Sequence, residues 1–233
     1  MYSLLKNSLK NQIREGTLFW SILRNVKNIA KYLLTLRFKS LYAYAHREFI
    51  ARNSIFLFKD ELFMASLFPK QILDKTIELF APKSVLDIGC GTGRALDYFL
   101  EHRIDALGIE GSAMAIQQAR NADKIVQYNL EQPLDLNRRF DMIWSYEFVE
   151  HIRPEFLNNL LTTFSNHADL IVLSAARPGQ GGVGHFNEQP ETYWIENFSE
   201  FGFSKQERGT QVLRMLPETF AENILVFERK VQH

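Results

Sequence analysis

The most informative stretch of this 233-residue chain is Val85-Leu86-Asp87-Ile88-Gly89-Cys90-Gly91-Thr92-Gly93. An apolar run ends in an acid and then opens into three glycines that alternate with other residues. Glycine is required where the backbone turns tightly or where a ligand approaches it closely. The pattern therefore predicts a β-strand over residues 84–88, a tight turn, and a helix that runs to about residue 102. Open α/β sheets bind ligands at such turns, at the carboxyl ends of their strands.

Strand and helix patterns alternate beyond this turn. Further strands are predicted at residues 104–109, 124–128, 140–145 and 170–174, and helices at residues 112–120 and 154–167. Such alternation is typical of a parallel sheet with helices on both faces.

The tail of the chain has a different pattern. Residues 203–208 and 223–229 look like two strands without a full helix between them, which predicts an antiparallel hairpin at the end of the sheet. The expected fold class is α/β: a doubly wound, seven-stranded, mostly parallel sheet with a helical N-terminal extension.

The N-terminal extension is strongly basic. Residues 1–59 contain eleven Lys and Arg against Glu15 and Glu48, a charge of +9, and residues 60–233 carry −9 because the total is zero. This asymmetry is typical of a basic arm on an acidic domain. Pro82 marks the expected boundary between a basic helical extension, residues 1–80, and the α/β domain, residues 81–233.

Apolar residues recur at helical spacing between Leu18 and Leu36, with Arg24, Lys27 and Lys31 on the opposite side. Each of these charges would cost roughly 2.5–3.5 kcal/mol near a bilayer centre, which excludes a membrane span. Two interpretations remain: a helix packed on the protein, or peripheral membrane contact through residues 1–50.

The chain carries no sign of secretion. Its single cysteine, Cys90, cannot form an internal disulfide, and residues 1–16 mix Leu with Lys and Arg instead of forming an apolar signal segment. The expected location is cytoplasmic, with peripheral association at a membrane as the alternative.

Residues 87–93 resemble the cofactor loop of class I methyltransferases, which use S-adenosylmethionine (SAM), and the family pattern extends over about residues 80–230. The resemblance implies SAM as the cofactor, with Asp87 supporting the loop and the amino-acid end of SAM. It also implies that the backbone of Gly89 to Gly93 passes beside the methionine part. A dinucleotide fingerprint would need a small residue where the chain has Arg94, which favours SAM over NAD.

Two later strand ends extend the cofactor site. Glu110 ends the second predicted strand, where an acid can accept hydrogen bonds from both ribose hydroxyls. Related enzymes often carry Asp where this chain has Asn129, and the Asn129 side-chain oxygen can still accept from the adenine amino group. The predicted cofactor-binding residues are Asp87, Gly89, Cys90, Gly91, Gly93, Glu110, Gly111, Asn129, Leu130 and Ser145.

The end of the fourth predicted strand resembles the turn below the transferred methyl group in small-molecule methyltransferases. Ser145 to Glu147 are expected to line the pocket, and His151 is either a general base or a structural residue. Neither the Pro-Pro-aromatic motif of DNA amino-methyltransferases nor a nucleophilic cysteine for cytosine chemistry is present here, so nucleic acid is disfavoured.

A glycine-rich segment, residues 177–190, follows the fifth predicted strand and suits a substrate lid. His185 in this segment is the preferred general base, ahead of His151. The predicted substrate-binding residues are Glu147, Asn187, Gln189, Tyr193 and Trp194, and no metal site is expected. The alternative is a solvated connection without a catalytic role.

These residues suit the transfer of a methyl group from SAM to a polar small molecule or glycan, at oxygen. Two other functions stay open. One is methylation of a macromolecule (RNA or protein) through the basic arm, and the other is a membrane-docked SAM-binding accessory protein.

Overall fold

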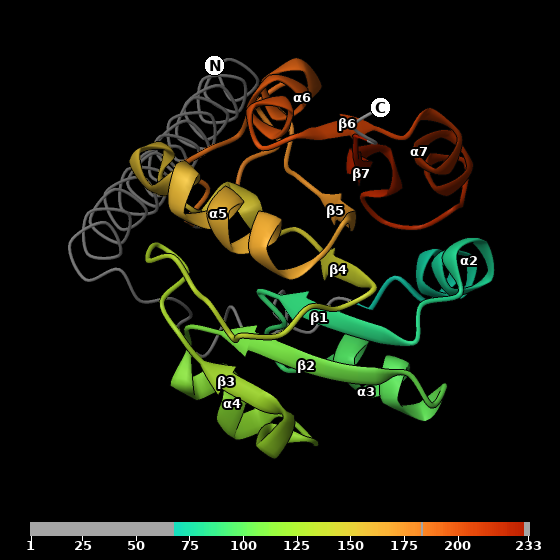
Figure 1. Cartoon of the computed structure of the whole chain (residues 1–233), viewed down its shortest axis with the longest axis vertical. Coiled ribbons are helices and arrows are strands. Elements are labelled where there is room, and N and C mark those ends of the chain that lie inside the picture. The colour runs from blue at the N-terminus through green and yellow to red at the C-terminus, as the bar shows by residue number, and fades with distance from the viewer. Residues whose placement is uncertain (1–67, 183, 231–233) are drawn as a thin grey trace, which may run out of the picture. The chain divides into compact units, whose positions relative to one another are not determined.

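The structure, a computed structural model, describes residues 68–182 and 184–230 (Figure 1). The predictions for the basic arm, for residues 1–50 and for peripheral membrane contact lie outside the described residues. None of the described helices combines the length and the apolar character that a membrane crossing requires.

Seven strands form a single sheet in the order β3-β2-β1-β4-β5-β7-β6. The strands β1 to β5 pair in parallel, and β7 runs antiparallel to both β5 and β6. Their bounds are β1 Ser84–Ile88, β2 Asp105–Glu110, β3 Ile125–Gln127, β4 Met142–Ser145, β5 Leu170–Ser174, β6 Phe203–Lys205 and β7 Ile224–Arg229. The predicted seven-stranded, mostly parallel α/β sheet is confirmed.

Six α-helices and four short 3-10 turns connect or flank the described strands. The helices are α2 Lys70–Phe80, α3 Arg94–Glu101, α4 Ala113–Gln118, α5 Leu157–His167, α6 Glu191–Glu200 and α7 Glu207–Arg214. The turns are η3 Ala122–Lys124, η4 Val149–His151, η5 Pro154–Phe156 and η6 Ala221–Asn223.

Helices cover both faces of the sheet. Successive strand residues point to opposite faces, so each strand contributes to two cores. In β4, Ile143 faces the core beneath α5 and α6, whereas Met142 and Trp144 face the core formed with α2, α3 and α7. Figure 1 shows these helices around the sheet. The apolar runs of β1, β4, β5 and β7 are therefore explained by burial on two sides, as expected for a doubly wound sheet.

One prediction for the tail is wrong. An eight-residue helix, α7, lies between β6 and β7, where no full helix was expected. Its sequence is mostly polar, and Leu213 is the only large apolar residue among its buried positions Gly209, Thr210 and Leu213, so it has too few apolar residues to be recognised as a helix. The Gln206 side chain caps the helix by accepting from the Gly209 N–H. The predicted antiparallel pairing of the two strands is present.

The helix α2 also differs from its expected assignment. It was placed in the N-terminal extension, yet its Ile72 and Leu73 are fully buried in the same core as β1 and β4. A β-carbon on Gly209 would lie 2.9 Å from the Phe80 ring, so α2 and α7 approach closely at a glycine. In its packing, α2 belongs with the sheet.

Candidate active site

The glycine turn lies where β1, β2 and β4 end at a common edge of the sheet. Strand register pairs Asp87 with both Gly108 and Trp144, which aligns these carboxyl ends. Gly89, Gly91 and Gly93 have φ angles of 73°, 56° and 76°, in the left-handed region that favours glycine. The alternating glycines of the motif are therefore required by the backbone itself.

Gly89 has a second reason to be glycine. A β-carbon there would lie 2.1 Å from the ring of Phe148, far inside van der Waals contact. Cys90 has its N–H donating to Ile109 O at 3.1 Å, and its thiol packs beneath Gly108, where a β-carbon would lie 2.7 Å from Sγ. Burial raises the pKa of the Cys90 thiol, which is thus a packing group and not a reactive one.

Glu110 ties the turn to the end of β2. Its carboxylate accepts hydrogen bonds from the N–H of Gly91 at 2.9 Å and from the N–H of Ser112 at 2.7 Å. Burial raises the pKa of Glu110, and these backbone donors act in the opposite direction. A carboxylate has about four lone-pair sites, so Glu110 keeps acceptor capacity for a ligand hydroxyl.

Asp87 is the most electrostatically unusual acid of the turn. It is 2% exposed, and its Oδ2 has no hydrogen-bond partner in the described part of the chain. Burial and the neighbouring Glu110 raise the pKa of Asp87 to about 8, against a backbone hydrogen bond from Leu96. A buried acceptor without a donor is costly, which indicates a ligand donor at this point.

The other predicted cofactor residues lie along the same edge. Asn129 is exposed beyond β3, and its Oδ1 accepts from the Glu131 N–H at 3.0 Å. Leu130 is buried in the core, and Gly111 O accepts from the Gln127 side chain at 3.3 Å. Ser145 ends β4 with a buried hydroxyl that has no partner among the described residues.

A second group of polar side chains follows β4. Glu147 has a φ angle of 48°, and its N–H donates to Ser174 Oγ on β5 at 2.7 Å. Its carboxylate accepts from Asn223 Nδ2 at 2.9 Å and from Gln180 Nε2 at 2.6 Å. Strain at a non-glycine residue is typical of functional turns, and here three hydrogen bonds hold it.

Glu150 and His151 lie on η4, three and four residues after Glu147. Glu150 is fully buried, and neither carboxylate oxygen has a partner in the part of the chain that the structure describes. Burial, followed by the charges of Glu147 and Glu188, raises the pKa of Glu150 well above its usual value. His151 has its Nδ1 on Gly184 O at 3.1 Å, and burial lowers its pKa to about 4.

The segment after β5 is fixed against η4. The backbone carbonyl of Glu150 accepts from the N–H groups of Phe186 and Asn187 at 2.9 and 3.0 Å. This places the His185 ring 4.9 Å from the His151 ring, in an edge-to-face arrangement. The two histidines predicted as alternative bases therefore lie side by side.

Glu188 orients His185 and closes the glycine-rich segment. Its carboxylate accepts from His185 Nδ1 at 2.9 Å and from the N–H groups of Gly179 and Gly181 at 2.9 and 2.7 Å. Burial alone would raise the pKa of Glu188, but the hydrogen bonds from His185 and the two glycines lower it. The glycine-rich segment is thus held together by hydrogen bonds to the Glu188 carboxylate.

The remaining predicted substrate residues differ in how far they are buried. Asn187 is fully buried with both side-chain polar atoms unpartnered among the described residues, and Gln189 is partly buried. Tyr193 packs against the core from the first turn of α6. Trp194 is 1% exposed within that core, so its ring is a packing group and only its unpartnered Nε1 supports substrate contact.

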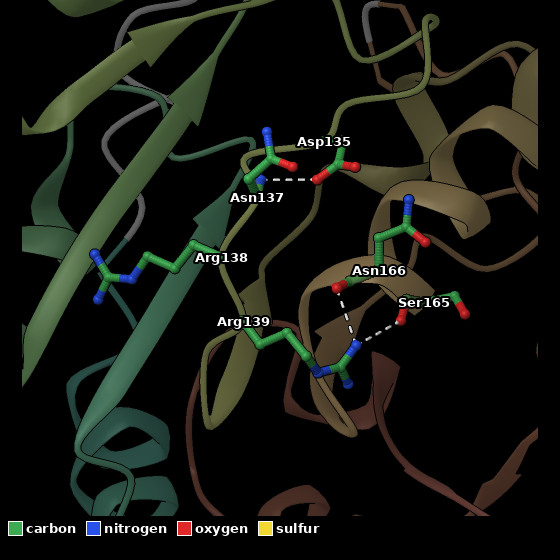
Figure 2. Close-up of a pocket in the computed structure, with 6 residues that line it drawn as sticks. All are labelled: Asp135, Asn137, Arg138, Arg139, Ser165 and Asn166. Atoms are coloured by element: carbon green, nitrogen blue, oxygen red, sulfur yellow. Dashed lines mark hydrogen bonds between the residues drawn. The ribbon is translucent and has the colours of Figure 1, made fainter.

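A surface cavity of about 350 Å³ lies at the opposite edge of the sheet (Figure 2). It is lined by Asp135, Asn137, Arg138, Arg139, Ser165 and Asn166. Arg139 donates to the carbonyls of Ser165 and Asn166 at 3.2 and 2.9 Å, and Arg138 pairs with Asp105 at 2.5 Å. Because its donors serve the fold and it is far from the strand carboxyl ends, this cavity is not the catalytic pocket.

The sequence matches a family model described as "Methyltransferase domain" over residues 62–207, well over half of the chain. The chain belongs to this methyltransferase family. A TehB-like SAM-dependent methyltransferase from Corynebacterium glutamicum has the same fold, with a TM-score of 0.55 at 19% identity, covering 80% of this chain and 99% of that one. This methyltransferase is SAM-dependent, and SAM is its cofactor.

Two curated relatives are similar in sequence. A probable chloroplastic tocopherol O-methyltransferase from Oryza sativa subsp. japonica is 32% identical over 107 residues, covering 40% of this chain and 29% of the relative. A ubiquinone biosynthesis O-methyltransferase from Rhodopseudomonas palustris is 32% identical over 91 residues, covering 36% of each. The match spans about a third of each relative's length.

The residues of this methyltransferase fit its cofactor. The unpartnered Asp87 Oδ2 offers an acceptor to an ammonium group, and the glycine turn exposes backbone where a β-carbon would block it. Glu110 offers a carboxylate to a ribose. When bound, SAM supplies a methyl group that its sulfonium already activates.

Sequence reasoning missed four polar residues of this methyltransferase. They are Glu150, Gln180, Glu188 and Asn223. For Glu150 and Glu188 a signal was present in the spacing, since Glu-x-x-Glu-His covers residues 147–151 and His-x-x-Glu covers residues 185–188. Asn223 had none, because only the pairing of β7 with β5 brings it to Glu147.

Proposed function

We propose that this methyltransferase transfers the SAM methyl group to an oxygen of a polar small molecule or glycan. The observation that carries the proposal is the polar lining beyond β4. There the carboxylate of Glu147 is held by two amides, and His185 by Glu188, beside the cofactor turn. Hydrogen-bonding side chains of this kind favour an acceptor rich in hydroxyl groups. The two curated relatives, named as O-methyltransferases, support oxygen as the methylated atom.

The cofactor half of the proposal assigns roles to residues of the turn. Asp87 accepts from the amino-acid end of SAM, and Glu110 accepts from the ribose hydroxyls. Asn129 faces the adenine, and the backbone from Gly89 to Gly93 lies along the methionine part, with Cys90 contributing only main chain. Gly111, Leu130 and Ser145 complete the lining.

The acceptor half holds the hydroxyl in line with the methyl group, which is the main demand of the reaction. The acceptor oxygen forms a bond to the methyl carbon, the carbon–sulfur bond breaks with its electron pair passing to sulfur, and the hydroxyl proton leaves. In the prediction from sequence the proton passes to His185, ahead of His151. Glu147, Asn187, Gln189, Tyr193 and Trp194 Nε1 are the proposed contacts to the acceptor.

Calorimetric titration of SAM into the full chain and into Glu110→Ala tests the cofactor half. We expect micromolar binding that weakens at least about tenfold, ~1.4 kcal/mol, in the variant. Glu101→Ala, an exposed acid paired with Arg120, is the matched control and leaves the affinity unchanged. Equal affinities in wild type and Glu110→Ala would remove Glu110 from the site.

A screen with methyl-labelled SAM tests the acceptor half. Sugars, polyols and phenols are offered separately from RNA and protein, and the product is analysed by mass spectrometry and NMR. We expect label on a hydroxylated small molecule or glycan, with the methyl carbon bonded to oxygen. Label only on RNA or protein, or on nitrogen, would overturn this half.

A further inference from the structure

Three potential metal ligands converge on the acceptor side. Glu150, His151 and His185 each offer one ligand atom, and these atoms lie within 4.8 Å of one another. The first two come from η4 and the third from the segment after β5, which the Glu150 carbonyl holds in place. An ion about 2.1 Å from each ligand atom would hold them about 3–3.5 Å apart, so side-chain movements of the order of 1 Å suffice.

Glu150 is the strongest indication that this cluster can bind a cation. Its side chain is fully buried, and both carboxylate oxygens lack a hydrogen-bond partner within the described ranges. Nearby Glu147 and Glu188 add negative charge, and the backbone N–H groups of Glu150 and Ala176 offset it only in part. A fully buried carboxylate with no cationic partner is unfavourable unless it is paired or binds a metal. A cation at this point would satisfy Glu150.

The two histidines are oriented as metal ligands usually are. His151 Nδ1 lies 3.1 Å from the Gly184 carbonyl, which can only accept, so Nδ1 carries the hydrogen. His185 Nδ1 lies 2.9 Å from the Glu188 carboxylate, with the same consequence. In both rings Nε2 is then the nitrogen with a lone pair. A carbonyl or carboxylate behind the ring is the usual outer shell of a metal-binding histidine.

Gly182 leaves room for this orientation. A β-carbon on Gly182 would lie 2.3 Å from His185 Nε2 and 2.6 Å from each adjacent ring carbon. Because the two ring carbons are only slightly farther away than Nε2, this β-carbon would lie against the face of the imidazole and not in its plane. The in-plane lone pair of Nε2 is therefore not blocked by Gly182.

We propose that Glu150, His151 and His185 bind one divalent transition-metal cation, of the Zn²⁺, Co²⁺ or Mn²⁺ type, on the acceptor side of the site. Two imidazoles and one carboxylate favour such an ion over Mg²⁺, which prefers oxygen ligands alone. Three protein ligands leave coordination positions open for an acceptor oxygen. No metal site was expected from the sequence, because the ligands lie on two separate segments.

The role of the ion rests on the proposed function. An acceptor hydroxyl bound to a divalent cation has a lowered pKa, so that water can take its proton as the oxygen attacks the methyl carbon. His185 then acts as a ligand and not as the base. Metal binding also explains why two histidines lie close to Glu147, Glu150 and Glu188, where a single base would be enough for proton transfer.

The test is a Co²⁺ titration of the full chain, prepared without a polyhistidine tag and treated with a chelator. Visible absorption reports Co²⁺ bound to protein nitrogen and oxygen. We expect the bands to saturate at one equivalent, and Glu150→Gln and His185→Gln each to weaken binding at least tenfold. His102→Gln, which changes an exposed histidine bonded to the Tyr98 carbonyl, is the matched control and leaves the titration unchanged.

Thermal unfolding by circular dichroism and SAM calorimetry on the same samples separate the outcomes. A folded chain that binds SAM but shows no Co²⁺ bands overturns the metal site and leaves His185 as the direct proton acceptor. Bands that persist unchanged in Glu150→Gln and His185→Gln overturn the assigned ligands. Co²⁺ binding with no methylation of any hydroxyl overturns the proposed function, while the metal site stands.

Discussion

The cofactor side and the acceptor side of this methyltransferase are built in different ways. On the cofactor side, the nine residues from Val85 to Gly93 form the end of β1 and a turn with three glycines at positive φ, and Glu110 braces this turn. On the acceptor side, side chains from the turn after β4, from the segment after β5 and from η6 are joined by long-range hydrogen bonds. The proposed cofactor site thus rests on local backbone geometry, and the proposed acceptor site on tertiary contacts.

The largest expected effect tests the local geometry directly. Gly89→Ala combines a positive φ angle with a β-carbon 2.1 Å from Phe148, whereas Gly181→Ala has a similar φ of 72° and nothing within 4 Å. Left-handed strain costs about 1–2 kcal/mol, and overpacking adds about 1–3 kcal/mol. We expect Gly89→Ala to weaken SAM binding at least about 100-fold or to unfold the chain, and Gly181→Ala to leave SAM affinity within about twofold.

Calorimetry and chemical denaturation of both variants supply the comparison. If the two substitutions had equal effects on SAM affinity, the close approach of Gly89 to Phe148 would carry no weight.

The next effect concerns the buried charge of the cofactor side. The pKa of Asp87 is raised to about 8 in the folded chain, so the folded state binds this proton more tightly than the unfolded state. The stability from protonated Asp87 is therefore present below about pH 4 and is lost as pH rises toward 8. Its slope approaches about 1.4 kcal/mol per pH unit between these limits.

Asp87→Asn removes this contribution. Urea denaturation without SAM at pH 5.5 and 7.5 measures it, because the difference between wild type and variant isolates Asp87 from Glu110 and Glu150. We expect the stability of the wild type relative to Asp87→Asn to fall by about 2–3 kcal/mol over this range. A difference that stays constant with pH would mean that Asp87 is ionised throughout.

The same division explains what could be predicted from the sequence. The strand, turn and helix around residues 85–93 follow from local chemistry, because an apolar run, an acid and alternating glycines leave few alternatives. The positions of β1 and β5 were predicted to the residue. The mostly polar α7 was missed because the small face that packs on α2 is centred on Gly209 and contains only one large apolar residue, Leu213.

The acceptor side was only partly predictable. His151 and His185 could be singled out as residue types, but their contact depends on the pairing of β4 with β5 and on the Glu150 carbonyl. Glu188 and Glu150 stayed unrecognised although each lies at a regular spacing from a histidine, because the sequence does not show which acids are buried. Trp194 was predicted to bind the substrate because it follows the glycine-rich segment, but its ring is buried in the hydrophobic core.

A smaller effect separates the two sides. Gly182→Ala would press a β-carbon onto the His185 ring at 2.3 Å, without backbone strain from a positive φ angle. We expect Co²⁺ affinity to fall about tenfold while SAM affinity changes less than twofold, since the change of about 1.4 kcal/mol falls on one ligand. Gly179→Ala, whose β-carbon meets nothing within 4 Å but whose φ is 86°, shows separately what backbone strain in the same segment does to Co²⁺ affinity. Loss of SAM binding in Gly182→Ala would show that the two sides are coupled.

The smallest effect lies at the adenine end of the cofactor side. Asn129 Oδ1 already accepts from the Glu131 N–H at 3.0 Å, so its first task is to hold the turn after β3. Asn129→Asp keeps that acceptor and offers a stronger one to an amino group, and we expect SAM to bind up to about threefold tighter, ~0.7 kcal/mol. Asn129→Ala loses both the turn and the contact, and we expect binding about tenfold weaker. If calorimetry gave equal affinities for wild type and both variants, the adenine would lie elsewhere. A small effect of the predicted sign would instead mean that even this exposed side chain serves SAM through the backbone it holds, as the rest of the cofactor side does.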